Sequence, residues 1–199
     1  MKKLAISLML SLGLVAGAEA GDAAAGKKIA AACGACHGAD GNSAAPTFPK
    51  IAGLGEKYLL KQLKDFKSGA RNNAIMAGQV AALSEGQMSD LAAYFASQKR
   101  SVGYAAKDKV AGGEKVYRAG NQATGVPACL ACHGADGNGM SAAGFPALGG
   151  QHADYIKAQL MAFQTDARAN DANEVMRDIA KKMSNKEIDE VAAYIQGLH

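Results

Sequence analysis

Residues 33–37 read C-G-A-C-H and residues 129–133 read C-L-A-C-H. These two copies of C-x-x-C-H contain all the cysteines of the chain, which are Cys33, Cys36, Cys129 and Cys132. The spacing is typical of covalent haem attachment, in which each thiol adds to one haem vinyl group and the following histidine binds the iron. We therefore expect two covalently bound haem c groups, with His37 and His133 as axial ligands.

Two other interpretations of these cysteines remain open. A bare C-x-x-C also occurs in redox dithiols and in zinc sites, and four cysteines can form two disulfides. Neither explains why a histidine follows the second cysteine in both copies, in a chain with only four histidines. Both copies also continue identically, as C-H-G-A-D-G-N at residues 36–42 and at residues 132–138. The pattern therefore favours haem.

The N-terminus has the features of a secretory signal. Lys2 and Lys3 precede an apolar run from Leu4 to Val15, and residues 18–20 read A-E-A. This order predicts a signal peptide over residues 1–20, cleaved after Ala20. A membrane-spanning helix needs about 20 apolar residues, and neither this run nor any later one is that long. We expect a periplasmic protein that is not an integral membrane protein.

The rest of the chain is a tandem repeat. Phe48-Pro49 recurs as Phe145-Pro146 at an offset of 97, and L-A-A-Y-F at residues 91–95 matches V-A-A-Y-I at residues 191–195 at an offset of 100. The repeat divides the mature chain into a first domain at residues 21–100, a linker at residues 101–112 and a second domain at residues 113–199. Each half is small for a self-sufficient hydrophobic core, so a covalent porphyrin would supply the missing apolar mass.

The signals within each half are helical. Segments 26–32 and 113–118 predict helices near the two haem motifs, and Tyr58, Gln62 and Phe66 fall on one face of a middle helix. A last helix in each half starts with a capping box, S-E-G-Q at residues 84–87 and S-N-K-E at residues 184–187. No stretch shows the sustained alternation of a strand. The predicted fold is all-α, as two similar domains.

The second axial ligand decides the chemistry of a haem, because it sets the potential and the access to iron. Among residues 21–112, His37 is the only histidine, and Met76 and Met88 are the only methionines. The candidates of the second half are Met140, Met161, Met176, Met183, His152 and His199. We therefore expect a methionine ligand in the first half. The repeat indicates whether it is Met76 or Met88.

Duplicated haem sites should keep their ligand at the same position. Only Met76 and Met176 pair methionine with methionine, at the offset of 100, whereas Met88 pairs with Ile188 and Met183 with Leu83. Both segments, 71–76 and 168–176, are polar and read as irregular rather than as an apolar stripe. We predict Met76 and Met176 as the axial ligands; the alternative is that they fill gaps in the core.

Two further repeated pairs have possible supporting roles. Pro49 and Pro146 lie in a loop whose carbonyl is suited to accept the Nδ1 proton of the haem histidine. Arg71 and Arg168 carry the forked guanidinium that suits haem propionates. The alternatives are ordinary turn prolines and solvated arginines.

With these residues in place, the chain resembles the cytochrome c4 family, dihaem carriers built from two class I cytochrome c domains. The resemblance covers the whole mature chain. It implies two six-coordinate His/Met haems, approximate two-fold packing of the domains, and delivery of electrons towards a membrane terminal oxidase. The segment 119–127 before the second motif is a departure that lengthens that loop.

Charge bears on the partners. Residues 21–100 hold ten Lys and Arg against six Asp and Glu, whereas residues 101–199 hold ten against eleven. We expect the more positive first domain to dock an acidic redox partner, with Lys57, Lys61 and Lys64 on the exposed side of one helix. Nucleic acid is not an expected partner, because the chain is exported and its lysines are not interleaved with a stacking platform.

Three classes of function follow from the haem motifs. An electron carrier needs saturated iron, which two methionine ligands would supply. A dihaem peroxidase needs an open site with acid and base groups, and the scarcity of histidine disfavours it. The haem subunit of a dehydrogenase would have the same haem sites as a carrier, so the sequence does not separate these two.

Overall fold

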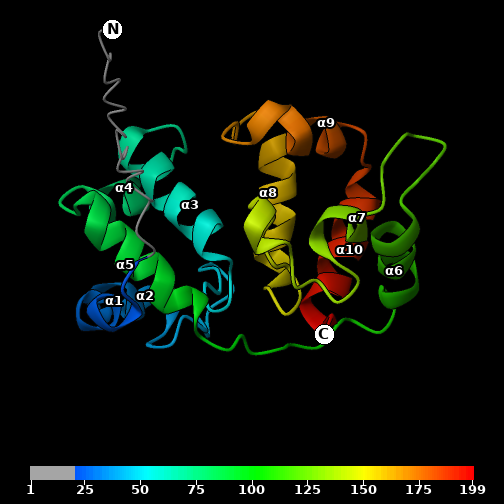
Figure 1. The fold of residues 1–199 in the computed structure, drawn as a ribbon. Coiled ribbons are helices and arrows are strands. Elements are labelled where there is room, and N and C mark those ends of the chain that lie inside the picture. The colour runs from blue at the N-terminus through cyan, green and yellow to red at the C-terminus, as the bar shows by residue number, and fades with distance from the viewer. Residues whose placement is uncertain (1–20) are drawn as a thin grey trace, which may run out of the picture.

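The computed structural model describes residues 21–199, and over this range the chain is helical and contains no strand (Figure 1). The all-α prediction is confirmed. The predicted signal peptide at residues 1–20 lies outside the described residues. Within residues 21–199, none of the helices combines the length and the apolar character needed to cross a bilayer.

The first domain contains five helices, which are α1 (Ala23–Ile29), α2 (Ala31–His37), α3 (Glu56–Ser68), α4 (Ala74–Val80) and α5 (Glu85–Ala96). The helix predicted over residues 26–32 is in fact two helices that meet at Ala30. The segment 71–76, predicted as irregular, is irregular up to Asn73 and enters α4 at Ala74. The side chain of Asn73 accepts a hydrogen bond from the Met76 amide, and this N-cap starts the helix.

The second domain repeats this order as α6 (Val110–Ala119), α7 (Leu130–His133), the 3-10 turn η1 (Ser141–Ala143), α8 (Ala153–Gln164), the 3-10 turn η2 (Ala172–Glu174), α9 (Val175–Lys181) and α10 (Asn185–Gly197). Met176 lies in α9, but only the last two residues of the segment 168–176 are α-helical, since residues 168–171 are irregular and Asn173 and Glu174 have positive φ. Helix α6 begins at Val110, inside the stretch predicted as linker.

Each domain has its own core, built around its last helix. The predicted capping boxes are confirmed: Ser84 and Ser184 each accept from the backbone three residues on, and Gln87 and Glu187 reach back to the cap. The buried stripes of these helices are Met88, Leu91 and Phe95 in α5, and Ile188, Val191 and Ile195 in α10. The two helices therefore start from local sequence and are held by burial.

Glycine permits the first helix of each domain to cross the last at very short range. A Cβ atom at Gly26 would lie 2.0 Å from the Asp90 carbonyl oxygen, and one at Gly113 would lie 2.3 Å from the Glu190 carbonyl oxygen. Real side chains do not tolerate such distances, so only glycine fits at these crossings. The same device in both halves is a product of the duplication.

The two domains lie side by side, with α3 of the first facing α8 of the second (Figure 1). Ala147 of the second domain packs into the buried cluster that contains Leu54 and Leu59 of the first. On the side of the linker, the Lys50 amide donates to Gln151 Oε1 at 2.9 Å, and Gln151 Nε2 donates to the Lys50 carbonyl at 2.7 Å. The interface is therefore both apolar and hydrogen-bonded.

The lysine docking face stays a prediction, and two of its lysines also contact the second domain. Lys57, Lys61 and Lys64 are exposed, as predicted, but the first two reach across the domain interface. Lys57 Nζ donates to the Ala142 carbonyl at 3.2 Å and Lys61 Nζ to the Asn170 carbonyl at 2.8 Å. Net charge along the sequence could not reveal these contacts, because they depend on how the domains pack.

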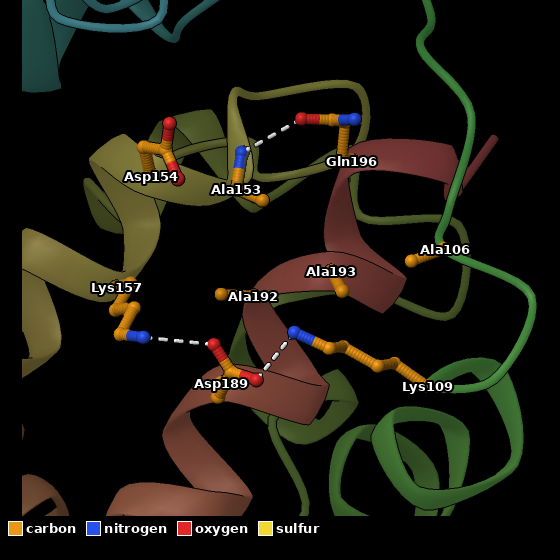
Figure 2. A pocket seen from close by; sticks show the side chains of 9 residues that line it. All are labelled: Ala106, Lys109, Ala153, Asp154, Lys157, Asp189, Ala192, Ala193 and Gln196. Atoms are coloured by element: carbon orange, nitrogen blue, oxygen red, sulfur yellow. Dashed lines mark hydrogen bonds and ion pairs between the residues drawn. The ribbon is translucent and has the colours of Figure 1, made fainter.

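The chain between the domains contacts the second domain at several points, one of which is a carboxylate of α10. Asp189 of α10 pairs with Lys109, which caps α6, and with Lys157 of α8 at 2.8 Å (Figure 2). The group borders a pocket of about 140 Å³. Hydrogen bonds and charge pairing with the two lysines lower the pKa of Asp189 to about 2. This ion pair network joins three helices at the point where the second domain begins.

Candidate functional site

The four motif cysteines lie in or beside the short helices α2 and α7, and each is half-buried. Burial raises the pKa of the Cys33 thiol, and it raises the pKa of the Cys129 thiol to about 11. Redox dithiols have a lowered cysteine pKa, because the thiolate is the reactive form. The environment of Cys33 and Cys129 therefore differs from that of a dithiol oxidoreductase.

The two motif histidines are buried and oriented in the same way. His37 Nδ1 lies 2.8 Å from the Pro49 carbonyl oxygen, and His133 Nδ1 lies 2.8 Å from the Pro146 carbonyl oxygen. A carbonyl can only accept, so the proton is on Nδ1 and the lone pair of Nε2 is left for a metal. Burial lowers the pKa of both imidazoles and favours the neutral form that ligates iron.

Aromatic rings complete the setting of each histidine. Phe48 lies edge-on to His37, and Phe145 edge-on to His133, with 6.4 Å between ring centroids in both pairs. From the sequence, these phenylalanines are only markers of the repeat, without a predicted role. The repeated Phe-Pro dipeptide was a usable sequence signal. Its phenylalanine ring and its proline carbonyl both contact the histidine of the preceding motif.

The two predicted methionine ligands occupy equivalent positions. Met76 is the third residue of α4 and Met176 the second of α9, and both are half-buried. The two segments share the same run of four exposed residues before the methionine. A half-buried thioether on a short helix is available to bind iron. Axial ligation by Met76 and Met176 stays a prediction.

The other methionines have different surroundings. Met88 is 2% exposed and Met183 is 4% exposed, and Met183 belongs to the apolar core of the second domain. Met140 and Met161 are more than 40% exposed. The first two are thus occupied by core packing, which agrees with their exclusion by the repeat.

Arg71 and Arg168 lie at the interface between the domains. Arg71 donates to Gln62, Tyr155 and Gln159 at 2.8–3.0 Å. Arg168 donates to the four acceptors Asn170, Gln159, Tyr58 and Gln62 at 2.9–3.2 Å. Their pairing with haem propionates stays a prediction, and the solvated alternative is wrong for the buried Arg168. Sequence reasoning missed the tyrosines and glutamines of this network, although all four are repeated at the offset of 97.

The donor set of each domain fits a covalent haem. Two thiols and one neutral imidazole are held on one short helix, and a thioether is available on another. Within residues 21–199, no group of three or more His, Cys, Asp or Glu side chains is placed to hold a metal ion, so the residues do not assemble the zinc site considered above. Haem needs only the histidine and the methionine as protein ligands to its iron.

Comparison with known protein families matches both halves of the chain to the same family. The family model described as cytochrome c matches residues 23–99 and again residues 110–199. Both matched ranges contain one C-x-x-C-H motif and one of the two predicted methionine ligands.

Several relatives match over most of the chain. Cytochrome c4 of Pseudomonas aeruginosa is 55% identical, with all of both chains covered. The crystal structure of reduced recombinant cytochrome c4 from Pseudomonas stutzeri has a TM-score of 0.88 and 51% identity, covering 90% of this chain and 100% of that one. The thiosulfate dehydrogenase electron acceptor of Thiomonas intermedia is 39% identical, covering 86% of this chain and 81% of the relative.

Proposed function

Because the chain belongs to the cytochrome c4 family, in which two cytochrome c domains each carry one haem, we propose that it is a periplasmic carrier that delivers electrons towards a membrane terminal oxidase. It holds two covalent haem c groups and is an electron-transfer protein rather than an enzyme. The periplasmic location is supported by the predicted signal at residues 1–20.

The observation that carries the proposal is the repetition of one site. We assign covalent attachment to Cys33, Cys36, Cys129 and Cys132, and iron ligation to His37, Met76, His133 and Met176. The bound haem supplies a reversible one-electron couple. The Pro49 and Pro146 carbonyls hold the imidazole proton on Nδ1, so each histidine keeps one orientation and one tautomer. A site with both axial positions filled by the protein exchanges electrons without binding a substrate.

Redox titration and ligand binding test this function together. We expect two one-electron transitions per chain and no binding of carbon monoxide to the reduced protein at neutral pH, because both axial positions are occupied. Acid acetone should leave both haems on the chain and no titratable thiol. Rapid carbon monoxide binding at either haem, or catalytic turnover of hydrogen peroxide, would instead support the peroxidase.

The direction of electron delivery needs its own experiment. The reduced protein, mixed with membranes of its source organism, should be oxidised at a rate that an oxidase inhibitor such as cyanide abolishes. A cyanide-insensitive rate would leave the carrier assignment intact and contradict delivery to an oxidase.

A second candidate function is to accept electrons from a dehydrogenase. It is favoured by the relative from Thiomonas intermedia, whose name describes an electron acceptor of thiosulfate dehydrogenase. In that case the protein should co-purify with a second polypeptide, or be reduced by thiosulfate only when that enzyme is added. A protein that stays oxidised when thiosulfate and that enzyme are both present, and that co-purifies with no second polypeptide, would count against it.

A further inference from the structure

Two arginines, one from each domain, meet at the interface between α3 and α8. Arg168 is 8% exposed, and Gln62, which both arginines contact, is 7% exposed. These contacts are not part of either haem motif. They nevertheless bring together residues that the sequence separates by about a hundred positions.

Each arginine is anchored in its own domain. The Arg71 guanidinium lies 4.6 Å above the Phe66 ring and donates to Gln62 at 2.9 Å. The Arg168 guanidinium lies 4.5 Å above the Phe163 ring and donates to Gln159, also at 2.9 Å. Stacking and one planar hydrogen bond fix the direction of a guanidinium.

Each arginine then reaches into the other domain. Arg71 donates to Tyr155 at 3.0 Å and to Gln159 at 2.8 Å. Arg168 donates to Tyr58 at 3.2 Å and to Gln62 at 3.0 Å. The two glutamine oxygens are thus shared, because each accepts from both arginines. We call these six residues, Tyr58, Gln62, Arg71, Tyr155, Gln159 and Arg168, the arginine bracket.

The bracket joins two like charges through neutral acceptors. Within residues 21–199, neither arginine forms an ion pair with a carboxylate. Burial raises the pKa of the Tyr58 phenol, but the charges of Arg168 and Arg71 outweigh burial and lower it. The glutamine oxygens are therefore indispensable, since without them two partly buried cations face each other with too few acceptors.

Other hydrogen bonds cross the interface in two places. On the side of α3, Lys57 and Lys61 donate to the Ala142 and Asn170 carbonyls, and Asn170 donates to Asp65. Lys50 and Gln151 pair beside the linker, and Lys50 Nζ also donates to the Ser101 carbonyl at 2.9 Å. These contacts stay when the bracket is broken. Without the bracket, α3 and α8 lose the contacts of both arginines, and the domains are held by the lysine contacts of α3 and by the pair beside the linker, which fix their orientation less firmly.

We propose that Arg71 and Arg168, held by Gln62 and Gln159, are positioning residues that fix the two haem domains in one orientation and so set the rate of electron transfer between the haems. The inference rests on the proposed function, since it needs a haem in each domain. It adds a role for residues that touch neither motif. A fixed geometry matters because small displacements of reacting centres have large effects on rates.

The test uses the full-length protein with both haems. The main variant combines Gln62→Leu with Gln159→Leu, which removes both shared acceptors and keeps side chains that suit a helix. The milder variant combines Tyr58→Phe with Tyr155→Phe and removes only the two phenol acceptors. Gln98→Leu is the matched control, because Gln98 Nε2 bonds to the Tyr94 carbonyl and Ser97 inside the first domain.

Two measurements report on the bracket. Residual dipolar couplings of the reduced protein give the relative orientation of the domains, and pulse reduction with less than one electron per chain gives the rate between the haems. For the glutamine pair we expect separate alignment of the two domains and a rate lower by about tenfold. The tyrosine pair should change both in the same direction but less, and Gln98→Leu should leave both unchanged.

The outcomes separate the bracket from the haem assignment. If the glutamine and tyrosine pairs keep wild-type haem spectra, a common alignment and an unchanged rate, the positioning role is wrong. If Gln98→Leu slows transfer as much as the glutamine pair, the effect is general destabilisation and the inference is also wrong. If the wild-type protein itself lacks two six-coordinate haems, the proposed function fails first. Should the glutamine pair not fold, the tyrosine pair decides.

Discussion

The orientation of His37 and His133 depends on a carbonyl 12 and 13 residues further along the chain. This contact was predictable from sequence, because Phe-Pro follows both motifs at nearly the same distance and proline has no amide hydrogen of its own. The partners of Arg71 and Arg168 were not predictable in the same way. A guanidinium suits many acceptors, and tertiary packing chose the tyrosines and glutamines of the other domain.

The buried methionines give a prediction at this scale. Met88→Ala and Met183→Ala should each lower the free energy of unfolding by about 2–5 kcal/mol, because each empties a filled position in a core. Denaturant titration measures the loss. The exposed Met161 is the control, and Met161→Ala should change stability by less than about 0.5 kcal/mol.

The helices show where local sequence is sufficient and where it is not. Capping boxes at Ser84 and Ser184 located the starts of α5 and α10 correctly, because a cap is decided within four residues. The polar segments that precede Met76 and Met176 begin as irregular chain, as predicted, but both methionines lie on short helices that were not predicted. These short helices have few sequence signals of their own. Helix α4 is stabilised by the Asn73 cap and by packing against α3, and packing is not visible in the local sequence.

The crossing of α6 and α10 gives a second prediction. Gly113→Ala should lower the free energy of unfolding by about 1–3 kcal/mol, because its Cβ would overlap the Glu190 carbonyl and push the helices apart. Gly86 is the matched control. It lies in a helix with open space around it, so Gly86→Ala should raise stability by about 0.5–1 kcal/mol. Equal effects at the two sites would contradict the packing argument.

Asp189 gives a third prediction, on pH. Its pKa in the folded protein, about 2, is below its ordinary value of 3.8, so the folded state favours the carboxylate. This contribution to stability is present above pH 3.8 and is lost as the pH falls towards 2. Asp189→Asn should lower stability at neutral pH and flatten its pH dependence in that window, as measured by denaturant titration at each pH.

The control for this prediction lies in the same pocket. Asp154 forms no ion pair within the described residues, so Asp154→Asn should leave the pairs of Asp189 with Lys109 and Lys157 intact and keep the pH dependence that these pairs cause (Figure 2). A slope that is the same in wild type and Asp189→Asn would show that the two lysines do not stabilise the folded carboxylate.

At the scale of the whole molecule, duplication made the sequence informative. The repeat predicted two domains. It also selected one methionine in each half, Met76 from two candidates in the first and Met176 from six in the second. It could not predict the packing of the halves. The contacts of Lys57 and Lys61 with the second domain are properties of the assembled pair, so net charge along the chain could not predict them.

The near-infrared charge-transfer band from methionine sulfur to ferric iron tests the central claim most directly. We predict that Met76→Ala and Met176→Ala each remove about half of this band and lower the potential of one haem, because thioether ligation raises the potential. Met88→Ala and Met183→Ala should keep the full band. A band that keeps its full intensity in either of the first two variants, or that loses intensity in either of the last two, would contradict His/Met ligation at the two repeated sites.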